Sequence, residues 1–333
     1  MQITRGQWII IILLTLSFIA TAGFVAFGLA AVLSFGPAYL YLKSIRNAEE
    51  TDREPWSALQ TAFVWGAVSG VFYALILNGL GGSLVFLYSG NDADLTFVLT
   101  AIIVAPIVEE FVKPLVLFRN ASVKGEIDEV EDGIVYGAAC GLGFGATENI
   151  LYGLSEGAVS SGLLGVIIIV TVRTVSSILL HLTASSFAGY GISQYLVKGA
   201  PFSVVIKYYL LAVLIHAAWN TAAVLGSPLI LVFSILLAIG GLEFSKRRIR
   251  ELDLEGSNIS PTSLRAENNR DDWWNASKDK WENKSQTQTS NTASPIFESG
   301  TESPASSMFQ NIDWRQTLGG LFFLFYILSG IIF

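Results

Sequence analysis

The sequence predicts an all-α, polytopic transmembrane helical bundle, and two observations carry this prediction. Of the 333 residues, 52% are hydrophobic and only 14% are charged, whereas about a quarter of the residues of a soluble domain are charged. The apolar residues also form long runs, such as 95–118, 162–190 and 204–225, and about 20 apolar residues are enough to cross the hydrocarbon core. We therefore expect a multi-pass integral membrane protein of the plasma (cell) membrane.

About nine membrane spans are expected along the chain. The first two form one apolar stretch that is too long for a single upright helix, so we divide it near Gly23. An alternative for residues 1–24 is a cleaved signal peptide, because Arg5 and an apolar run precede Ala20-Thr21-Ala22, which resembles a cleavage site. The expected segments are 7–23, 25–42, 57–79, 95–118, 133–153, 162–190, 204–224, 228–245 and 317–333.

Lysine and arginine alternate between the connections, which predicts the orientation. The connections 43–56 and 119–132, the stretch 198–207 and the end of the eighth segment carry Lys or Arg. The intervening loops, around 80–94, 154–161 and 225–228, contain neither residue. Because basic loops stay on the cytoplasmic side, we expect the first group in the cytoplasm, and the regular alternation supports the segment count.

The region after the eighth segment has a different composition. Ser, Thr, Asn, Asp and Glu dominate residues 251–313, with no sustained apolar period, and such a stretch buries too little surface to fold alone. We therefore expect a disordered cytoplasmic tail over 246–316, followed by a C-terminal transmembrane segment over 317–333. The net charge of −7, with no basic face visible, gives no reason to expect a nucleic-acid partner.

The fourth segment carries two glutamates and a lysine, Glu109, Glu110 and Lys113. A charge at the centre of the bilayer costs at least about 2.5–3.5 kcal/mol, so such residues usually have a function. Lys113 is spaced to pair with either glutamate on one helix face, which leaves the other carboxylate available as a base. The alternative is a structural ion pair near the cytoplasmic end of the helix, which explains one glutamate well and two poorly.

The fifth segment carries Glu148 and Asn149 behind a regular series of glycines. Glycines spaced four apart form a ridge on which another helix packs closely. Glu148 lies seven residues after the third glycine and close to the same face, so it is expected to point into the bundle, as a functional group or as a structural hydrogen-bond partner. The glycines are Gly133, Gly137, Gly141 and Gly145.

The sixth and seventh segments contain the two histidines of the chain, His181 and His216. Arg173 precedes His181, and Asn220 follows His216 by one helical turn. A polar stripe of this kind often serves helix packing, but the histidines and the arginine favour a site. Four consecutive spans therefore supply groups capable of catalysis. Thr174, Ser177 and Ser185 share one helix face with His181.

Three glutamates, two histidines and an asparagine suit hydrolysis by activated water. A carboxylate can take a proton from water, and histidine or asparagine donors can stabilise the oxyanion. Alternatively, Glu148, His181 and His216 form a three-ligand set of the kind that holds a divalent metal, zinc above all, with one position open. A zinc ion would lower the pKa of a bound water to about 7, so both schemes remain open.

These residues resemble the PrsW family of intramembrane proteases, over roughly residues 25–245, which we therefore expect to be a protease core. The resemblance implies a metalloprotease that acts on membrane-embedded protein substrates, such as anti-sigma factors. It rests on Asp52-Arg53-Glu54-Pro55, Glu109-Glu110-x-x-Lys113, Phe144-x-x-x-Glu148-Asn149, Arg173 with His181, and His216-x-x-x-Asn220.

The wider group that includes type II CAAX prenyl endopeptidases implies a different division of roles. By that resemblance Glu109 and the residue that ends the second motif would activate water, and His216 and Asn220 would form the oxyanion hole. The second motif ends with histidine in those relatives and with Glu148 here. This departure leaves the use of a metal open and makes His181 a candidate for the missing role.

Two other functional classes fit parts of the sequence. An ion- or proton-coupled transporter or channel also places Glu, Lys, Arg and His in the membrane, and its helices are often broken, as Pro106 and Pro114 would allow. No internal repeat between the two halves supports that class. A non-catalytic membrane scaffold of the same fold is the third alternative.

Overall fold

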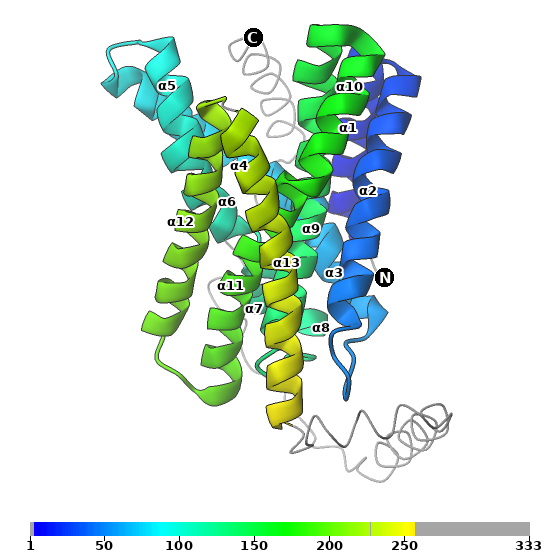
Figure 1. The fold of residues 1–333 in the computed structure, drawn as a ribbon, viewed down its shortest axis with the longest axis vertical. Helices are drawn as coiled ribbons and strands as arrows, with labels where there is room; N and C mark the ends of the chain where they lie inside the picture. Colours follow the sequence, from blue (N-terminus) through cyan, green and yellow to red (C-terminus); the bar gives the residue numbers. More distant parts are fainter. Residues whose placement is uncertain (1–2, 227, 257–333) are drawn as a thin grey trace, which may run out of the picture. The chain divides into compact units, whose positions relative to one another are not determined.

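The computed structural model describes residues 3–226 and 228–256, and every regular element in that part of the chain is helical (Figure 1). The predicted fold class, a helical membrane bundle, is confirmed. The predicted segment 317–333 and residues 257–316 lie outside the described residues. The α-helices are α1 (Arg5–Ala22), α2 (Phe24–Arg46), α3 (Trp56–Val64), α4 (Val71–Tyr88), α5 (Ala93–Leu99), α6 (Ala105–Val112), α7 (Leu115–Arg119), α8 (Ala121–Lys124), α9 (Asp132–Tyr152), α10 (Ala158–Val175), α11 (Ser177–Lys198), α12 (Ser203–Val224) and α13 (Pro228–Gly256). Short π-helical turns, η1 (Trp65–Gly70), η2 (Thr100–Val104) and η3 (Gly153–Gly157), join α3 to α4, α5 to α6 and α9 to α10.

Five helical stretches of the described chain are long and apolar enough to cross a membrane. Each of the first eight predicted segments is helical, but the expected count of about nine spans is not confirmed. Helix α9 shows one reason, because nearly all of its residues are buried by other helices, so it needs no lipid-facing apolar surface. The five stretches are Phe24–Arg46, Trp56–Tyr88, Ala93–Arg119, Ser160–Lys198 and Ser203–Val224.

Two backbone features divide apolar runs that the sequence shows as continuous. Gly23 has a φ of 82°, in the left-handed region that favours glycine, and it separates α1 from α2 as predicted. The predicted sixth segment is broken at Ser176, where φ is −121° and ψ is −76°. This break places Arg173 at the end of α10 and His181 in the first turns of α11.

The glycine ridge of α9 packs directly on α11, as predicted. A methyl group added at Gly137 would overlap the carbonyl oxygen of Ser185, and one added at Gly141 would overlap that of His181. The two helices therefore touch through their backbones, a contact that only glycine allows. This contact fixes the position of His181 relative to α9.

The basic connections lie at one end of the bundle (Figure 1). The α2–α3, α8–α9 and α11–α12 connections and the end of α13 all meet there. Arg250 forms an ion pair with Glu50 at 2.9 Å, which joins α13 to the α2–α3 connection. The arrangement agrees with the alternation of Lys and Arg, and the assignment of this end to the cytoplasm stays a prediction.

Helix α13 is longer than predicted. It continues to Gly256, so residues 246–256, which were assigned to a disordered tail, are helical. Ile249 and Leu252 are buried, and Asp253 accepts hydrogen bonds from the amides of Glu50 and Thr51. The polar composition concealed these contacts, because a surface helix needs only one buried face.

Candidate active site

A buried network of charged side chains connects α6, α11 and α12. The ammonium nitrogen of Lys113 lies 2.5 Å from Oε1 of Glu110 and 2.8 Å from Nδ1 of His181. The side chains of Lys113 and Glu110 are completely buried. Because buried charges need partners, these contacts fix which glutamate Lys113 neutralises.

Glu110 is the more fully bonded of the two adjacent glutamates. Its Oε1 also lies 2.7 Å from Nδ1 of His216, and its Oε2 accepts a hydrogen bond of 3.3 Å from the hydroxyl of Ser185. The sequence left open which glutamate pairs with Lys113, and the structure selects Glu110. This carboxylate therefore holds a lysine, a histidine and a serine from three helices.

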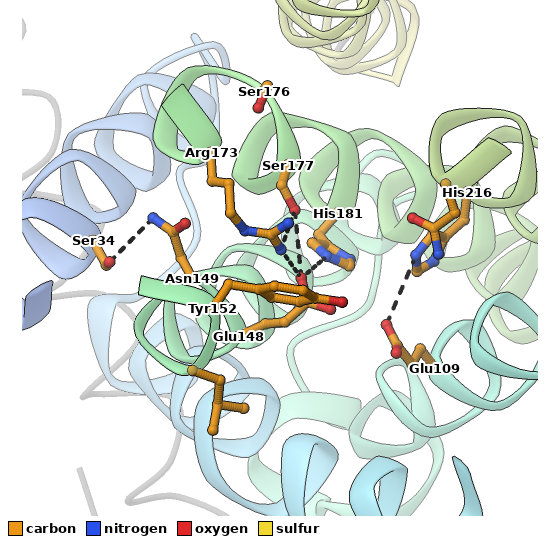
Figure 2. Close-up of polar contacts among 12 residues, drawn as sticks. Ser34, Glu109, Glu148, Asn149, Tyr152, Arg173, Ser176, Ser177, His181 and His216 are labelled. Carbon is orange, nitrogen blue, oxygen red and sulfur yellow. Dashed lines mark hydrogen bonds and ion pairs between the residues drawn. The ribbon is translucent and has the colours of Figure 1, made fainter. Parts of the chain in front are cut away.

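Glu109 keeps one carboxylate oxygen without a hydrogen bond. Its Oε1 accepts from the amide of Asn78 at 3.1 Å. Its Oε2 is buried, has no hydrogen-bond partner among the described residues, and lies 3.8 Å from Nε2 of His216 (Figure 2). A buried polar atom without a partner is costly, and such atoms often mark a site of chemistry or ligand binding.

Glu148 receives three donors from α10 and α11 (Figure 2). Its Oε2 accepts from Arg173 at 2.7 Å and from Ser177 at 3.4 Å, and it lies 2.9 Å from Nε2 of His181. The guanidinium group of Arg173 lies 3.8 Å from the centre of the Tyr152 ring. Glu148 thus points toward neighbouring helices, as the glycine register predicted, and its side chain is 17% exposed.

The partners of each imidazole indicate its tautomer. Lys113 as an ammonium group has only protons to offer, so Nδ1 of His181 accepts and Nε2–H donates to Glu148. For His216, Nδ1 faces the carboxylate of Glu110 and therefore carries the proton, which leaves the lone pair of Nε2 directed toward Glu109. The two rings are nearly perpendicular, with centroids 4.9 Å apart.

Two predicted asparagines are bonded elsewhere. The amide nitrogen of Asn220 donates to the carbonyl oxygen of Ala101, in η2, at 2.8 Å. The amide nitrogen of Asn149 donates to the hydroxyls of Ser34 and Thr174 and to a carbonyl oxygen of α10, which ties α9 to α2 and α10 (Figure 2). An oxyanion role for Asn220 would require its bond to η2 to open.

One group of possible metal ligands lies within this network. Glu109, His181 and His216 each offer one ligand atom, and these atoms lie within 4.8 Å of one another. The predicted set contained Glu148 in place of Glu109, whereas here Oε2 of Glu148 is already shared by Arg173 and His181. A carboxylate and two imidazoles are a donor set typical of catalytic zinc.

The free atoms of this group fit a divalent metal. Oε2 of Glu109 lacks a hydrogen bond, and Nε2 of His216 presents a lone pair. His181 would have to release Lys113 or Glu148 to coordinate, because both of its nitrogens are bonded. The donor chemistry therefore fits, with one rearrangement.

The sequence did not identify every member of the network. Ser177 and Ser185 were recognisable from the polar stripe that they share with His181. Asn78, the amide partner of Glu109, carried a weaker signal as a lone polar residue in an apolar segment. Tyr152 carried none, because an aromatic residue at the end of a span is ordinary.

The fold and the site together define a class, a polytopic helical membrane protein with a carboxylate–imidazole centre among its spans. The family model for the PrsW family intramembrane metalloprotease matches residues 54–240. The chain belongs to this family. The matched range contains the whole Glu109–His216 network.

Curated relatives of this chain include three proteins named protease PrsW. The one from Clostridioides difficile (strain 630) is 32% identical over 168 residues, which cover 50% of this chain and 66% of the relative. The one from Geobacillus kaustophilus (strain HTA426) is 34% identical over 125 residues, 36% of this chain and 48% of the relative. The one from Bacillus subtilis (strain 168) is 30% identical over 125 residues. The chain thus spans about half to two-thirds of these relatives, and no solved structure matches it.

Proposed function

We propose that this protein is an intramembrane endopeptidase that hydrolyses a peptide bond of a membrane-embedded protein with activated water. One observation carries the proposal: Oε2 of Glu109 is buried, accepts no hydrogen bond and lies 3.8 Å from Nε2 of His216. The neighbouring carboxylate of Glu110 is instead bonded to Lys113 and His216. Membership of the PrsW family and the names of the relatives support it. The plasma membrane is the proposed location.

In this proposal Glu109 is the carboxylate that accepts a proton from the attacking water. Lys113 is engaged by Glu110 and His181, so it does not neutralise Glu109 through a direct contact. Oε2 of Glu109, which is buried and accepts no hydrogen bond, is therefore the oxygen available to take that proton. Nε2 of His216, which presents a lone pair, would lie beside the reacting atoms as an acceptor.

Glu110 and Lys113 serve as positioning residues. Glu110 fixes the ring of His216 through Nδ1, as the carboxylate partners of functional histidines commonly do. Lys113 fixes the ring of His181 in the same way from the opposite side. Both rings are therefore held before substrate binds, which lowers the cost of organising the site.

In a metal-dependent version of this proposal, zinc would be held by Glu109, His181 and His216, and Glu109 would then be a ligand and not the base. When bound, zinc supplies a water of lowered pKa and polarises the scissile carbonyl. Glu148, the partner of Arg173 and the more exposed carboxylate, is then the residue available to accept the proton. The ligand set with Glu148 in place of Glu109 is the alternative, with Glu109 as the base.

Cleavage of a transmembrane peptide by purified protein tests the function. The wild type should cleave, whereas Glu109→Gln and His216→Ala should be inactive although both insert and accumulate. Glu156→Gln is the matched control, because Glu156 is an exposed glutamate on η3, outside the network. Absence of cleavage by the wild type, or cleavage by both site variants, contradicts the proposal.

The domain limits and substrate class complete the proposal. The protease core is residues 25–245, the region that the family match largely covers. The tail and the segment 317–333 would then tether or regulate the core. Membrane-embedded proteins such as anti-sigma factors are the substrate class implied by the family resemblance.

A further inference from the structure

A second group of buried carboxylates lies outside the network, at the end of the bundle where the basic connections meet. Glu49 and Glu54 belong to the α2–α3 connection, and Asp132 is the first residue of α9. Each offers one carboxylate oxygen, and these atoms lie within 4.8 Å of one another. All three side chains are almost fully buried.

Within the part of the chain that the structure describes, Arg46 is close enough to attract Glu49 and Glu54, but no basic side chain forms an ion pair with the three carboxylates. The two nearest arginines donate to main-chain oxygens: Nε of Arg46 to the carbonyl of Glu54 at 2.6 Å, and Nε of Arg53 to that of Glu49 at 2.9 Å. No ion pair joins any of the three carboxylates to a basic side chain among the described residues. Three acidic groups thus share a buried volume with one nearby arginine and no ion pair, which is unfavourable unless protons or a bound cation neutralise them.

Glu49 adds an independent observation that points to a ligand. Its side chain is only 1% exposed, and its Oε1 has no hydrogen-bond partner among the described residues. Donors orient other oxygens of the group: the amide of Glu54 donates to Oε2 of Glu49 at 2.9 Å, and the amide of Glu129 donates to Oδ2 of Asp132 at 2.6 Å. The side chains of Glu54 and Asp132 also form a hydrogen bond with each other. Tyr136 donates its hydroxyl proton to Oε2 of Glu54. The group is thus held in place around an unsatisfied oxygen.

The electrostatics of the connection agree with this reading. Burial, with the nearby carboxylate of Asp132, raises the pKa of Glu49 to about 9. Burial also raises the pKa of Glu54 to about 8. Burial is the largest cause of both raised pKa values, and the guanidinium of Arg46 offsets it only in part at Glu49.

We propose that Glu49, Glu54 and Asp132 bind a hard divalent cation of the Ca²⁺ and Mg²⁺ class. All available donors are oxygens, and these cations prefer carboxylate and carbonyl oxygens over nitrogen and sulfur. The site lacks imidazole and thiolate groups, which a zinc site would normally include. It is therefore chemically distinct from the Glu109–His181–His216 group.

The bound ion would join two parts of the chain that are distant in sequence. Glu49 and Glu54 precede α3, and Asp132 begins α9, the helix that carries Glu148. Asp253 of α13 binds the amides of Glu50 and Thr51 next to the site, so α13 would be tied into the same junction. The ion would thus stabilise the base of α9, and this inference does not depend on the proposed protease activity.

Ion titration of the purified full chain tests the site. Protein in detergent is stripped with a chelator, transferred to metal-free buffer and titrated separately with Ca²⁺ and with Mg²⁺, with calorimetric binding and thermal unfolding as readouts. We expect one saturable site for at least one of the two ions and a Tm that rises with ion concentration, since a ligand specific for the native state stabilises it. Glu49→Gln and Glu54→Gln should weaken binding by about tenfold or more.

Matched variants separate this site from general electrostatic attraction. Glu156→Gln removes the same charge from an exposed position on η3, at the opposite end of α9 from Asp132, and should keep the ion response. His216→Ala should keep it as well, because His216 lies in the other group. In metal-free buffer Glu49→Gln should unfold at about the same temperature as the wild type or higher, since Gln keeps an acceptor for the amide of Glu54 and carries no charge to bury. A lost ion response would then not reflect misfolding.

Three results would overturn the inference. The first is no saturable binding of either ion to the wild type. The second is binding that survives in both Glu49→Gln and Glu54→Gln. The third is binding that is lost only in Glu131→Gln, which would place the ion in the adjacent group of Glu129, Glu131 and Asp253.

Discussion

The ammonium nitrogen of Lys113 lies 2.8 Å from Nδ1 of His181, so a cation on α6 holds an imidazole on α11, 68 residues away in the sequence. The same ammonium group is bonded to Glu110 at 2.5 Å. Both contacts are buried, and together they determine which glutamate of the adjacent pair keeps a free oxygen.

The two adjacent glutamates should differ in their effect on stability. Glu109→Gln should reduce cleavage by about 10²-fold or more with little change in Tm, because Oε2 of Glu109 bonds no other side chain. Glu110→Gln should lower stability by about 3–5 kcal/mol as well as cleavage, because it leaves the buried charge of Lys113 without its anion. Thermal unfolding and peptide cleavage measure the two effects, and equal Tm losses would argue against the assigned roles.

The Glu110–Lys113 pair should behave as one unit. Lys113→Met alone leaves the Glu110 carboxylate buried without its cation, whereas Glu110→Gln with Lys113→Met removes both charges. The double variant should therefore be more stable than the sum of the single changes implies, by a coupling of about 1–3 kcal/mol. A cycle of four unfolding measurements gives this coupling. Additive losses would show that the contact contributes little.

Metal analysis should distinguish the two water-activation schemes. In the zinc scheme purified protein contains near-stoichiometric zinc, which falls in His181→Ala and in Glu109→Gln but persists in Glu148→Gln. Chelator should then inhibit cleavage, and added zinc should restore it, after an incubation long enough to reach a buried site. Zinc lost in Glu148→Gln and kept in Glu109→Gln would instead favour the predicted ligand set. Full activity of metal-free protein would exclude the zinc scheme and support the metal-independent scheme, in which Glu109 is the base.

The glycine ridge of α9 should be intolerant of even one methyl group. Gly141→Ala should destabilise the protein by about 1–3 kcal/mol, because the added carbon would overlap the backbone of His181 on α11. Gly28→Ala is the control, since no atom lies within 4 Å of the position its methyl would take, and it should be neutral or stabilising by up to about 1 kcal/mol. Similar Tm values for the two variants would contradict the close contact.

Truncation and labelling should locate the tail. A chain ending at Gly256 should keep cleavage and Tm, whereas one ending at Arg250 should lose stability, because it lacks the Asp253 bonds to the α2–α3 connection. Cysteines introduced at 119–132 and in 257–316 should be labelled from the cytoplasmic side. Cys140 is buried and should not interfere. Labelling of the tail from outside would reverse the orientation.

The sequence predicted the fold class, the division at Gly23, the contact face of α9 and the residue types of the network. These depend on local patterns, such as apolar run length and a four-residue spacing of glycines. It did not predict which glutamate Lys113 neutralises, because Glu109 and Glu110 both lie within one turn of it. It also missed the break at Ser176 and the continuation of α13, because both depend on contacts with distant helices. The hydrogen bond from Asn78 to Glu109 was missed for the same reason.

The backbone contact between α9 and α11 also limits how a substrate can enter. Where α9 and α11 touch through glycines, their backbones leave little between them to compress or rotate, so we expect this side of the centre, with Glu148 and His181, to move as a single body. If the protein is the proposed protease, space for a polypeptide substrate would therefore open on the other side of the centre. That side is formed by α6 and α12, which carry Glu109 and His216. The same movement of these helices would then admit the substrate and bring Glu109 and His216 together.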